Sequence, residues 1–275
     1  MGFAVSPDSY DRFMGRFSRP LAAVFADFAG VARAGSDDGD ADDAGPSRAV
    51  LDVGCGPGAL TAELLERGAR VSAVDPSAEF VAAAQQRHPA AAVLEAAAEA
   101  LPFADEAFDA ALAQLVVHFM RDPAAGIAEM TRVTRPGGTV AACVWDHRRG
   151  PLALFWQGVA SLHRGDGPVP GEAHRAGQHE GDLDRLLRGA GLADVEATAL
   201  EVEAAFDGFD DWWATFELGV GPAGDHVAGL DQRARQALRA ACRALLPGDA
   251  PFVVHGVAHA ARGTRPAGRA PLRPS

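Results

Sequence analysis

The sequence predicts an α/β fold in which a mostly parallel sheet lies between two layers of helices. Two observations predict it. From Arg48 onward, short apolar runs alternate with helical patterns, as in chains built from repeated strand–helix–strand units. In addition, the first apolar run leads directly into glycines at positions 54, 56 and 58, and a helical pattern follows at once. A strand, a glycine turn and a helix in this order open a nucleotide-binding unit, where missing side chains let a ligand touch the backbone.

The other elements follow from the apolar patterns in chain order. In the helix after the glycine turn, Leu60, Leu64 and Leu65 share one face, and Gly68 occupies the position of a helix-ending glycine. Strands are expected near residues 49–53, 70–75, 92–95, 108–114 and 139–145. Helices are expected between them, near 58–67, 77–87 and 122–134. After Gly150 we expect a helix at 151–163, a polar stretch at 164–180, a helix at 181–190, a strand at 194–203, a helical segment at 209–246 and a strand at 252–260.

The glycine turn also indicates which kind of ligand it binds. Its spacing is Gly-x-Gly-x-Gly, whereas dinucleotide sites have Gly-x-Gly-x-x-Gly. Asp52 precedes the turn, and a carboxylate at this position repels a pyrophosphate but attracts an ammonium group. The predicted ligand is therefore a nucleoside that carries an amino acid rather than a dinucleotide.

Asp75 supports this prediction. It ends the second expected strand about 20 residues beyond Gly54, where a carboxylate is placed to accept both hydroxyls of a ribose. The alternative is that Asp75 only caps the next helix, with Pro76 at the first helical position. Because Asp75 occurs together with the glycine turn, we favour the ribose role.

Five short motifs then follow one another between residues 48 and 145. They are Asp52-Val-Gly54-Cys-Gly56-Pro-Gly58, Asp75, Leu101-Pro102-Phe103, Phe108-Asp109 and Arg135-Pro136-Gly137-Gly138. In this order they resemble the motifs of class I S-adenosylmethionine-dependent methyltransferases, and the chain is most similar to the branch often called methyltransferase type 11.

The resemblance implies a Rossmann-like three-layer sandwich. Its mostly parallel seven-stranded sheet would include an antiparallel last strand, and the helical segment 209–246 would cover the mouth of the site. The implied cofactor is S-adenosylmethionine, which would donate its methyl group to a nucleophile of a small-molecule acceptor. The cofactor residues implied around the first two strands are Asp52, Gly54, Cys55, Gly56, Gly58, Asp75 and Pro76.

One cofactor motif departs from the pattern of the family. Relatives commonly carry an Asp-Ala pair before Leu101-Pro102-Phe103, in which the acid accepts the adenine amino group. Aligned on Leu101, the acidic position is Ala97 in this chain. The backbone of Ala98 can still contact the adenine, and Glu95 and Glu99 are the two carboxylates available to compensate for the missing acid. Without compensation, the loss of one charge-assisted hydrogen bond would weaken binding by about 1.5–3 kcal/mol.

Candidate catalytic residues follow the fourth expected strand. Gln114 ends that strand, at the edge of the sheet where ligands bind, and we expect it to contact the cofactor. His118 is the candidate general base for an O–H or N–H acceptor, because histidine titrates near neutral pH. The alternative is that His118 only shapes the pocket beside Phe119 and Met120. His147, beyond the fifth strand, either lines the acceptor side or lies at the surface.

The segment before the first strand is a second candidate region. Tyr10 and Arg16 stand before an apolar helix, and in this branch of the family such a segment commonly folds over the cofactor. Tyr10 and Arg16 would then meet the methionine carboxylate. The alternative is an amphipathic docking helix whose Phe13 and Phe17 pack against the core one turn apart.

Composition excludes several other classes of function. The net charge of −12 argues against a nucleic-acid partner, which requires a positive surface. We expect no membrane span and no secretory signal, because the chain has no long apolar run and no basic-then-apolar start. Three cysteines fit a reduced cytoplasmic protein. No metal site is expected, since His174 and His179 lack converging ligands.

The chain therefore divides into five expected parts. Residues 1–33 form an N-terminal helical cover, 34–46 an acidic flexible loop and 47–150 the cofactor-binding core. Residues 151–261 contain a helical cover and the last strands of the same domain, and 262–275 a disordered tail. Two other functions remain open: a Rossmann-type nucleotide-dependent oxidoreductase, and a catalytically silent cofactor-binding protein, for which Ala97 is the only support. The acceptor, the methylated atom and the oligomeric state are not specified by the sequence.

Overall fold

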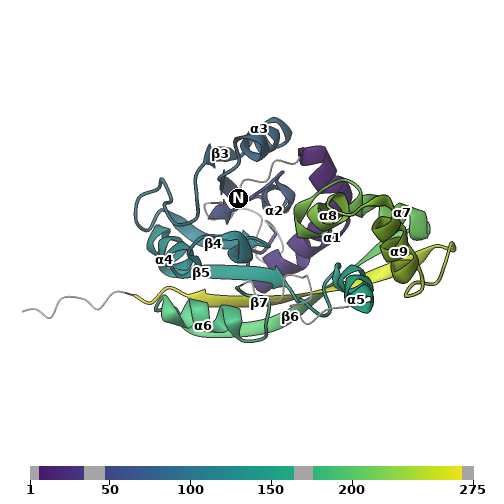
Figure 1. Ribbon diagram of the computed structural model, residues 1–275. Coiled ribbons are helices and arrows are strands. Elements are labelled where there is room, and N and C mark those ends of the chain that lie inside the picture. Colours follow the sequence, from purple (N-terminus) through teal and green to yellow (C-terminus); the bar gives the residue numbers. More distant parts are fainter. Residues whose placement is uncertain (1–5, 34–46, 164–175, 268–275) are drawn as a thin grey trace, which may run out of the picture.

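The computed structural model of the chain describes residues 6–33, 47–163 and 176–267 (Figure 1). Seven strands form one sheet in the order β3-β2-β1-β4-β5-β7-β6. In chain order the strands are β1 (Ala49–Val53), β2 (Arg70–Asp75), β3 (Ala92–Glu95), β4 (Phe108–Gln114), β5 (Thr134–Trp145), β6 (Ala193–Phe206) and β7 (Phe252–Thr264).

The pairing of the strands confirms the predicted fold class. The first five strands run parallel to one another, whereas β7 is antiparallel to both β5 and β6. The strand order reverses between β1 and β4, which start the two halves of the sheet. In an open sheet of this kind, ligands bind outside the carboxyl ends of the strands at such a reversal.

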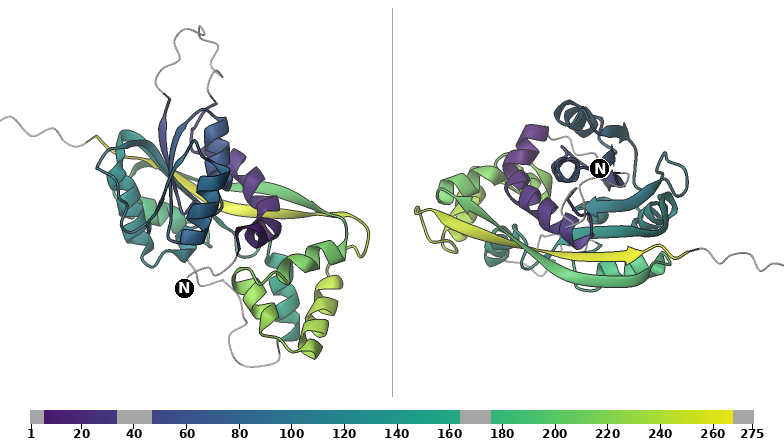
Figure 2. Two further views of the ribbon diagram at one scale, coloured as in Figure 1. Left: turned by 90° about the horizontal axis from the view of Figure 1, so that it is seen from above. Right: turned by 180° about the vertical axis from the view of Figure 1, so that it is seen from behind.

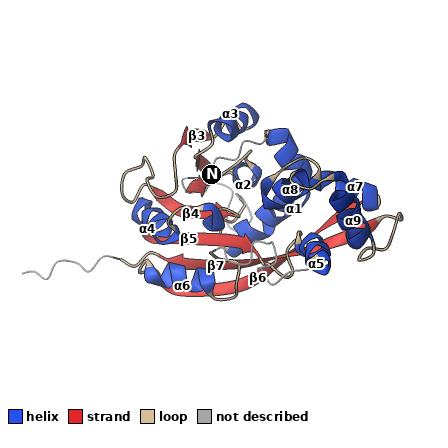
Figure 3. Ribbon diagram, in the orientation of Figure 1, coloured by secondary structure: helices blue, strands red, loops and turns tan. Residues whose placement is uncertain are grey.

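Helices cover both faces of the sheet and one of its ends (Figures 1 and 3). One face is covered by α1 and α2 and the other by α4 and α6, while α3 packs beside β2 and β3. Helices α5, α7, α8 and α9 gather at one end of the sheet (Figure 2). The helices are α1 (Pro7–Phe28), α2 (Ala59–Glu66), α3 (Ala78–Arg87), α4 (Pro123–Val133), α5 (Ala153–Leu162), α6 (Asp182–Gly189), α7 (Phe209–Phe216), α8 (Gly221–Ala228) and α9 (Gln232–Arg243), with a 3-10 turn η1 at Val117–Phe119.

The apolar pattern of the central strands explains why both faces need a cover. Every residue of β1 is buried, as expected for a strand with a helix layer on each side. Val50 and Leu112 face the core under α1 and α2, whereas Leu51 and Ala111 face the core under α4 and α6. The two layers of helices therefore each cover an apolar face of the sheet.

Arg67 fixes the cover helix α1 to the core. Its side chain is 2% exposed and forms ion pairs with Asp27 at 2.6 Å and Glu63 at 2.8 Å. The same guanidinium donates to the carbonyl oxygens of Ala23 and Val31 at the end of α1. A buried guanidinium with all of its partners in place links α1 to α2, because an unpaired charge there would be very costly.

Arg87 holds the other end of α1. It pairs with Asp8 at 2.9 Å and with Asp11 at 2.7 Å, and so connects the first turns of α1 to the end of α3. Ser6 begins the helix by accepting the backbone N–H of Ser9, and Pro7 follows at the first helical position. The cover is thus one long helix that begins well before the expected apolar stretch.

Several boundaries differ from the expectation. The segment 209–246 is divided into three helices, with Gly219 and Gly221 in the left-handed region at the break. Strand β7 continues to Thr264, so residues 262–264 of the expected tail are in the sheet, where Arg262 pairs with Glu196. Residues 34–46 and 268–275 lie outside the described residues. No helix in the described part of the chain is long and apolar enough to cross a membrane.

Candidate functional site

The glycine turn connects β1 to α2 at the centre of the sheet's carboxyl edge. The N–H groups of Gly54 and Cys55 both donate to the carbonyl of Val74, at 2.8 and 2.9 Å. Gly54 has φ +71°, and a Cβ on it would lie 2.2 Å from Cγ2 of Val116. Gly56 has φ +53°, but a Cβ on it would meet no heavy atom within 4 Å. Gly54 is therefore required by packing, whereas Gly56 borders open space, and Gly58 precedes α2 as its N-cap.

Asp75 organises this turn. One carboxylate oxygen accepts the N–H of Gly56 at 2.9 Å, and the other accepts the N–H of Ser77 at 2.9 Å. Each oxygen keeps a lone pair for a further donor. The N-cap of α3 is Ser77, whose hydroxyl accepts the N–H of Phe80, so the alternative role of Asp75 as the cap is wrong. Pro76 is exposed and precedes the helix by two residues instead of starting it.

Asp52 lies beneath the turn and is almost completely buried. Its carboxylate accepts the hydroxyl of Thr61 at 2.6 Å. Burial raises the pKa of Asp52 to about 7, and the nearby Asp75 adds to this, although the hydrogen bond from Thr61 opposes it. Cys55, in the turn itself, is buried, and this burial raises the pKa of its thiol. Asp52 thus changes its charge near neutral pH, whereas Cys55 is an inert thiol.

The expected adenine end lies after β3. Ala97 is exposed and Ala98 is buried, while Glu95 pairs in register with Asp75 at the same edge of the sheet. Glu99 is directed elsewhere, because its carboxylate accepts the backbone N–H groups of Arg121 and Asp122 at 2.7 and 3.1 Å. Of the two carboxylates available to compensate for Ala97, Glu99 is therefore already engaged, and Glu95 is the better placed.

Gln114 ends β4 next to the glycine turn. Its amide nitrogen donates to the carbonyl of Ser18 on α1 at 2.9 Å. Its amide oxygen is buried and has no hydrogen-bond partner among the described residues. Leu115, the next residue, has φ +63°, which is unfavourable for a leucine. An unpaired buried oxygen and a strained residue at one strand end are typical of a ligand site.

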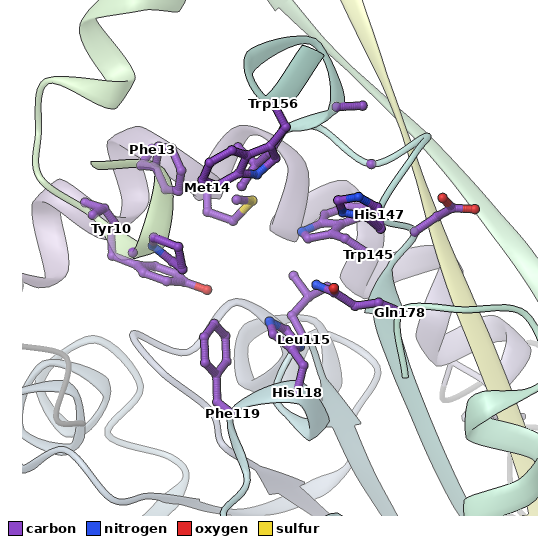
Figure 4. A pocket seen from close by; sticks show the side chains of 17 residues that line it. Tyr10, Phe13, Met14, Leu115, His118, Phe119, Trp145, His147, Trp156 and Gln178 are labelled. Carbon is purple, nitrogen blue, oxygen red and sulfur yellow. The ribbon is translucent and has the colours of Figure 1, made fainter. Parts of the chain in front are cut away.

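A pocket opens beyond the ends of β4 and β5 (Figure 4). Aromatic side chains from the cover, from η1, from β5 and from α5 form most of its wall, and His118 and His147 also face it. Its described lining consists of Tyr10, Phe13, Met14, Leu115, His118, Phe119, Trp145, Asp146, His147, Gly150, Leu152, Ala153, Trp156, Gln178, Val220, Gly221 and Pro222. It is a largely apolar pocket with a few polar groups, as is usual for small-molecule sites.

Tyr10 connects this pocket to the glycine turn. Its ring packs edge-on against Phe80 of α3, with 5.5 Å between the ring centres. Burial raises the pKa of Tyr10 to about 12, and the negative charges of Asp75 and Asp11 add to the effect. Tyr10 therefore lies close to Asp75 and also lines the pocket.

Arg16 does not reach the site. Its guanidinium forms two hydrogen bonds with the carboxylate of Asp211 on α7, at 2.7 and 2.8 Å, and a third with the carbonyl of Ala205. It also stacks over the ring of Phe206 at 4.7 Å. The predicted contact of Arg16 with the methionine carboxylate is corrected by these contacts, while Phe13 and Phe17 pack into the core as the docking-helix alternative expects.

The structure also adds residues that the sequence did not indicate. Trp145, Trp156 and Gln178 come from three separate segments and face one pocket (Figure 4). Their positions in the sequence carry no periodicity or spacing that would unite them. Of the two histidines considered for a metal, His174 lies outside the described residues and His179 is not part of any metal-ligand cluster found among those described.

Comparison with known proteins finds a family match in the part of the chain around the glycine turn. Residues 51–142 match the family described as a methyltransferase domain. These residues include the glycine turn, Asp75 and Gln114. Residues 51–142 thus form a methyltransferase domain similar to those of class I S-adenosylmethionine-dependent methyltransferases. The cofactor of such domains is S-adenosylmethionine, and the open space at Gly56, the lone pairs of Asp75 and the Gln114 oxygen without a partner among the described residues suit a ligand with hydroxyl and ammonium donors.

The chain matches its curated relatives only in part. Over 141 residues it is 36% identical to a malonyl-(acyl-carrier protein) O-methyltransferase of Salmonella typhimurium, which covers 51% of this chain and 53% of that protein. The chain thus spans about half the length of this curated relative.

Solved structures confirm the fold. A phosphoethanolamine N-methyltransferase of Haemonchus contortus aligns with a TM-score of 0.56 at 15% identity, over 95% of this chain and 57% of that one. A geranyl diphosphate C-methyltransferase of Streptomyces coelicolor aligns with a TM-score of 0.51 at 17% identity, over 91% of this chain and 80% of that one.

The two glycines give a matched pair of substitutions. Gly56→Ala should cost only about 1 kcal/mol of folding free energy for the left-handed backbone, but it should weaken binding of S-adenosylhomocysteine at least tenfold, since the methyl group enters open ligand space. Gly54→Ala should destabilise the fold by about 3 kcal/mol or more, because the new methyl group overlaps Val116. Denaturant unfolding and calorimetric titration measure the two effects. Equal loss of stability in both variants would contradict this division of roles.

The pKa of Asp52 predicts a pH dependence. Because the folded value of about 7 exceeds the ordinary 3.8, this group's contribution to stability is present below pH 3.8 and is lost as the pH rises through 7. Cofactor affinity should change in the opposite direction. The ligand's ammonium group favours the ionised carboxylate, so the affinity for S-adenosylhomocysteine should rise between pH 6 and pH 8. Titration calorimetry should show proton release near pH 7, and Asp52→Asn should abolish it. Proton release that persists in the variant would assign the titration to another group.

Proposed function

We propose that this protein transfers the methyl group of S-adenosylmethionine to a small-molecule acceptor bound in the pocket beside the glycine turn. One observation carries the proposal. The short segment after β4 contacts the turn through Val116 and lines the pocket through Leu115 and His118. A cofactor on the turn and an acceptor in the pocket would therefore be separated by only this segment.

The residues at the sheet edge have separate roles in holding the cofactor. Asp75 accepts the ribose hydroxyls with the lone pairs that Gly56 and Ser77 leave free. The unpaired oxygen of Gln114 accepts the ammonium group of the methionine part, and the buried charge of Asp52 strengthens this attraction. The backbone of Ala98 contacts the adenine. Tyr10 covers the ribose side, where it lies near Asp75.

The chain's contribution to the reaction is mainly positioning. When bound, S-adenosylmethionine would supply an activated methyl group on its sulfonium, which the acceptor's nucleophile would take with release of S-adenosylhomocysteine. The aromatic wall of the pocket excludes water and orients the acceptor toward the turn. Because α1 is fixed at both ends by Arg67 and Arg87, its side chains form a stable part of this wall.

His118 is the group that we propose as general base. It follows β4 directly, in η1, and its ring faces the pocket beside Phe119, with 3.9 Å between the ring centres (Figure 4). From this position it accepts the proton that an O–H or N–H acceptor loses when it is methylated. A carbon nucleophile without such a proton has no need of His118.

The acceptor is specific to this chain rather than inherited from the relatives. Of the pocket's described lining, only Leu115, His118 and Phe119 lie within the matched residues 51–142. The substrate named for the Salmonella protein is therefore not assigned to this chain. The net charge of −12 argues against a nucleic-acid acceptor, and three buried free cysteines support a cytoplasmic location.

The oxidoreductase alternative and the methyltransferase differ in the nucleotide that they bind. In a thermal-shift assay, S-adenosylhomocysteine should stabilise the protein by about 2.7 kcal/mol at a concentration one hundred times its dissociation constant. A nicotinamide dinucleotide should leave the melting temperature unchanged. The opposite pattern would support the oxidoreductase. Binding of S-adenosylhomocysteine without turnover on any of a broad set of acceptors would support the catalytically silent protein.

The role of His118 is tested once an acceptor is found. His118→Ala should lower kcat roughly a hundredfold and leave the affinity for S-adenosylhomocysteine unchanged, because the ring faces the pocket. Initial rates measured between pH 6 and pH 9 give kcat and KM separately. A variant that raises only the KM for the acceptor would make His118 a wall of the pocket rather than the base.

A further inference from the structure

Three polar atoms on the pocket wall lack partners. They are the indole N–H groups of Trp145 and Trp156 and the amide oxygen of Gln178, and none has a hydrogen-bond partner among the described residues. The three side chains are 9%, 8% and 5% exposed. Buried polar groups are nearly always hydrogen-bonded, and leaving one unpaired is costly. Three such groups on the lining of one pocket point to a ligand that supplies the missing partners (Figure 4).

The charge of the pocket restricts this ligand. No lysine or arginine belongs to the described lining, so a phosphate or carboxylate would find no permanently charged cation there, only the imidazoles of His118 and His147. The carboxylate of the lining, Asp146, is already engaged. It accepts hydrogen bonds from the backbone N–H groups of Arg148 and Arg149 and from the Arg149 side chain, and it lies 3.2 Å from Nε2 of His259. The pocket therefore suits an uncharged ligand.

The wall also indicates the ligand's shape. Rings of Tyr10, Phe13, Phe119, Trp145 and Trp156 surround the space from different elements. Aromatic walls favour flat, apolar molecules, because stacked and edge-on contacts add to the burial of apolar surface. The indole groups supply donors, whereas the Gln178 oxygen supplies an acceptor. One hydroxyl group satisfies both kinds, since its oxygen accepts and its proton donates.

We propose that the acceptor is an uncharged aromatic molecule with at least one hydroxyl group, held by the indole N–H groups of Trp145 and Trp156 and by the amide oxygen of Gln178. This inference rests on the proposed function, because it treats the pocket as the acceptor site. It makes these three residues determinants of acceptor specificity, and none of them lies within the matched residues 51–142.

Three naphthalene compounds test the proposal on the full chain saturated with S-adenosylhomocysteine. They are naphthalene, 2-naphthol and 2-naphthyl phosphate, which share one ring system and differ in the polar group. Equilibrium dialysis gives each dissociation constant. We expect 2-naphthol to bind roughly tenfold more tightly than naphthalene, the value of one or two ordinary hydrogen bonds. The phosphate should bind most weakly, because it is charged.

Substitutions then test whether the two indole N–H groups and the Gln178 oxygen cause the tighter binding of 2-naphthol. Trp145→Phe and Trp156→Phe keep an aromatic wall but remove one donor each, and Gln178→Met keeps the length of the side chain but removes the acceptor. Each should reduce the preference for 2-naphthol over naphthalene by about three- to tenfold. Trp213→Phe is the matched control, because the Trp213 indole donates to Glu217 at 3.0 Å and does not line the pocket. Its preference should stay as in the unaltered protein.

Other results would overturn the proposal. They are equal binding of naphthalene and 2-naphthol, tightest binding of the phosphate, absence of 2-naphthol binding, or an unchanged preference in all three pocket variants. Binding of S-adenosylhomocysteine is measured separately for every variant and shows that each is folded. If that binding fails while 2-naphthol still binds with the expected preference, the proposed function falls and the pocket assignment stands.

Discussion

The contact between Gly54 and Val116 is the constraint on which the site depends. It brings the turn after β1 against the segment after β4, at the point where the strand order reverses. A side chain on Gly54 would overlap Val116, since its Cβ would lie 2.2 Å from Cγ2. The same contact sets how far the open space at Gly56 lies from Leu115 and His118. Parallel strands alone would leave this distance undefined, because their ends are joined by loops that can take many paths.

The cofactor half of the site could be predicted from the sequence because its signals are local. A strand, a glycine turn and an acid at the next strand end require only neighbouring elements, and the structure places Asp52, Gly56 and Asp75 together at the sheet edge. The sequence left one local ambiguity, the residue that caps the N-terminus of α3. Asp75 and Ser77 both suit an N-cap, and the hydroxyl of Ser77 takes that role because both oxygens of Asp75 accept other backbone N–H groups.

The acceptor half could not be predicted in the same way. Trp145, Trp156 and Gln178 meet only after β5, α5 and the segment before α6 have packed around one space, and none belongs to a motif. Arg16 shows that the sequence can also predict a ligand contact that the fold does not make. Its place before the expected apolar helix suggested a ligand contact, but a carboxylate far along the chain, Asp211, forms two hydrogen bonds with it. A charged side chain pairs with the best-matched partner that the fold brings near it. The spacing of residues in the sequence does not show which partner that is.

The chain divides into a part that matches the methyltransferase family and a part that forms most of the pocket wall. Residues 51–142 carry the family's cofactor machinery, whereas α1, α5 and α8 supply walls that the family motifs do not specify. Arg67 and Arg87 tie one of these walls, α1, to the helices that follow β1 and β2. If the pocket holds the acceptor as proposed, its wall is built on the cofactor core, and acceptor specificity can change without changing the glycine turn.

Hydrogen exchange in the presence and absence of S-adenosylhomocysteine tests the central claim most directly, because it locates binding without a known acceptor. The account predicts slower exchange at residues 54–58, at Ser77 and at residues 97–99, together with the first turns of α1 near Tyr10. Amides of α6 and β6, on the far side of the sheet, should be unchanged. Protection confined to those distant elements, or no protection at a saturating concentration, would contradict the placement of the cofactor at the glycine turn.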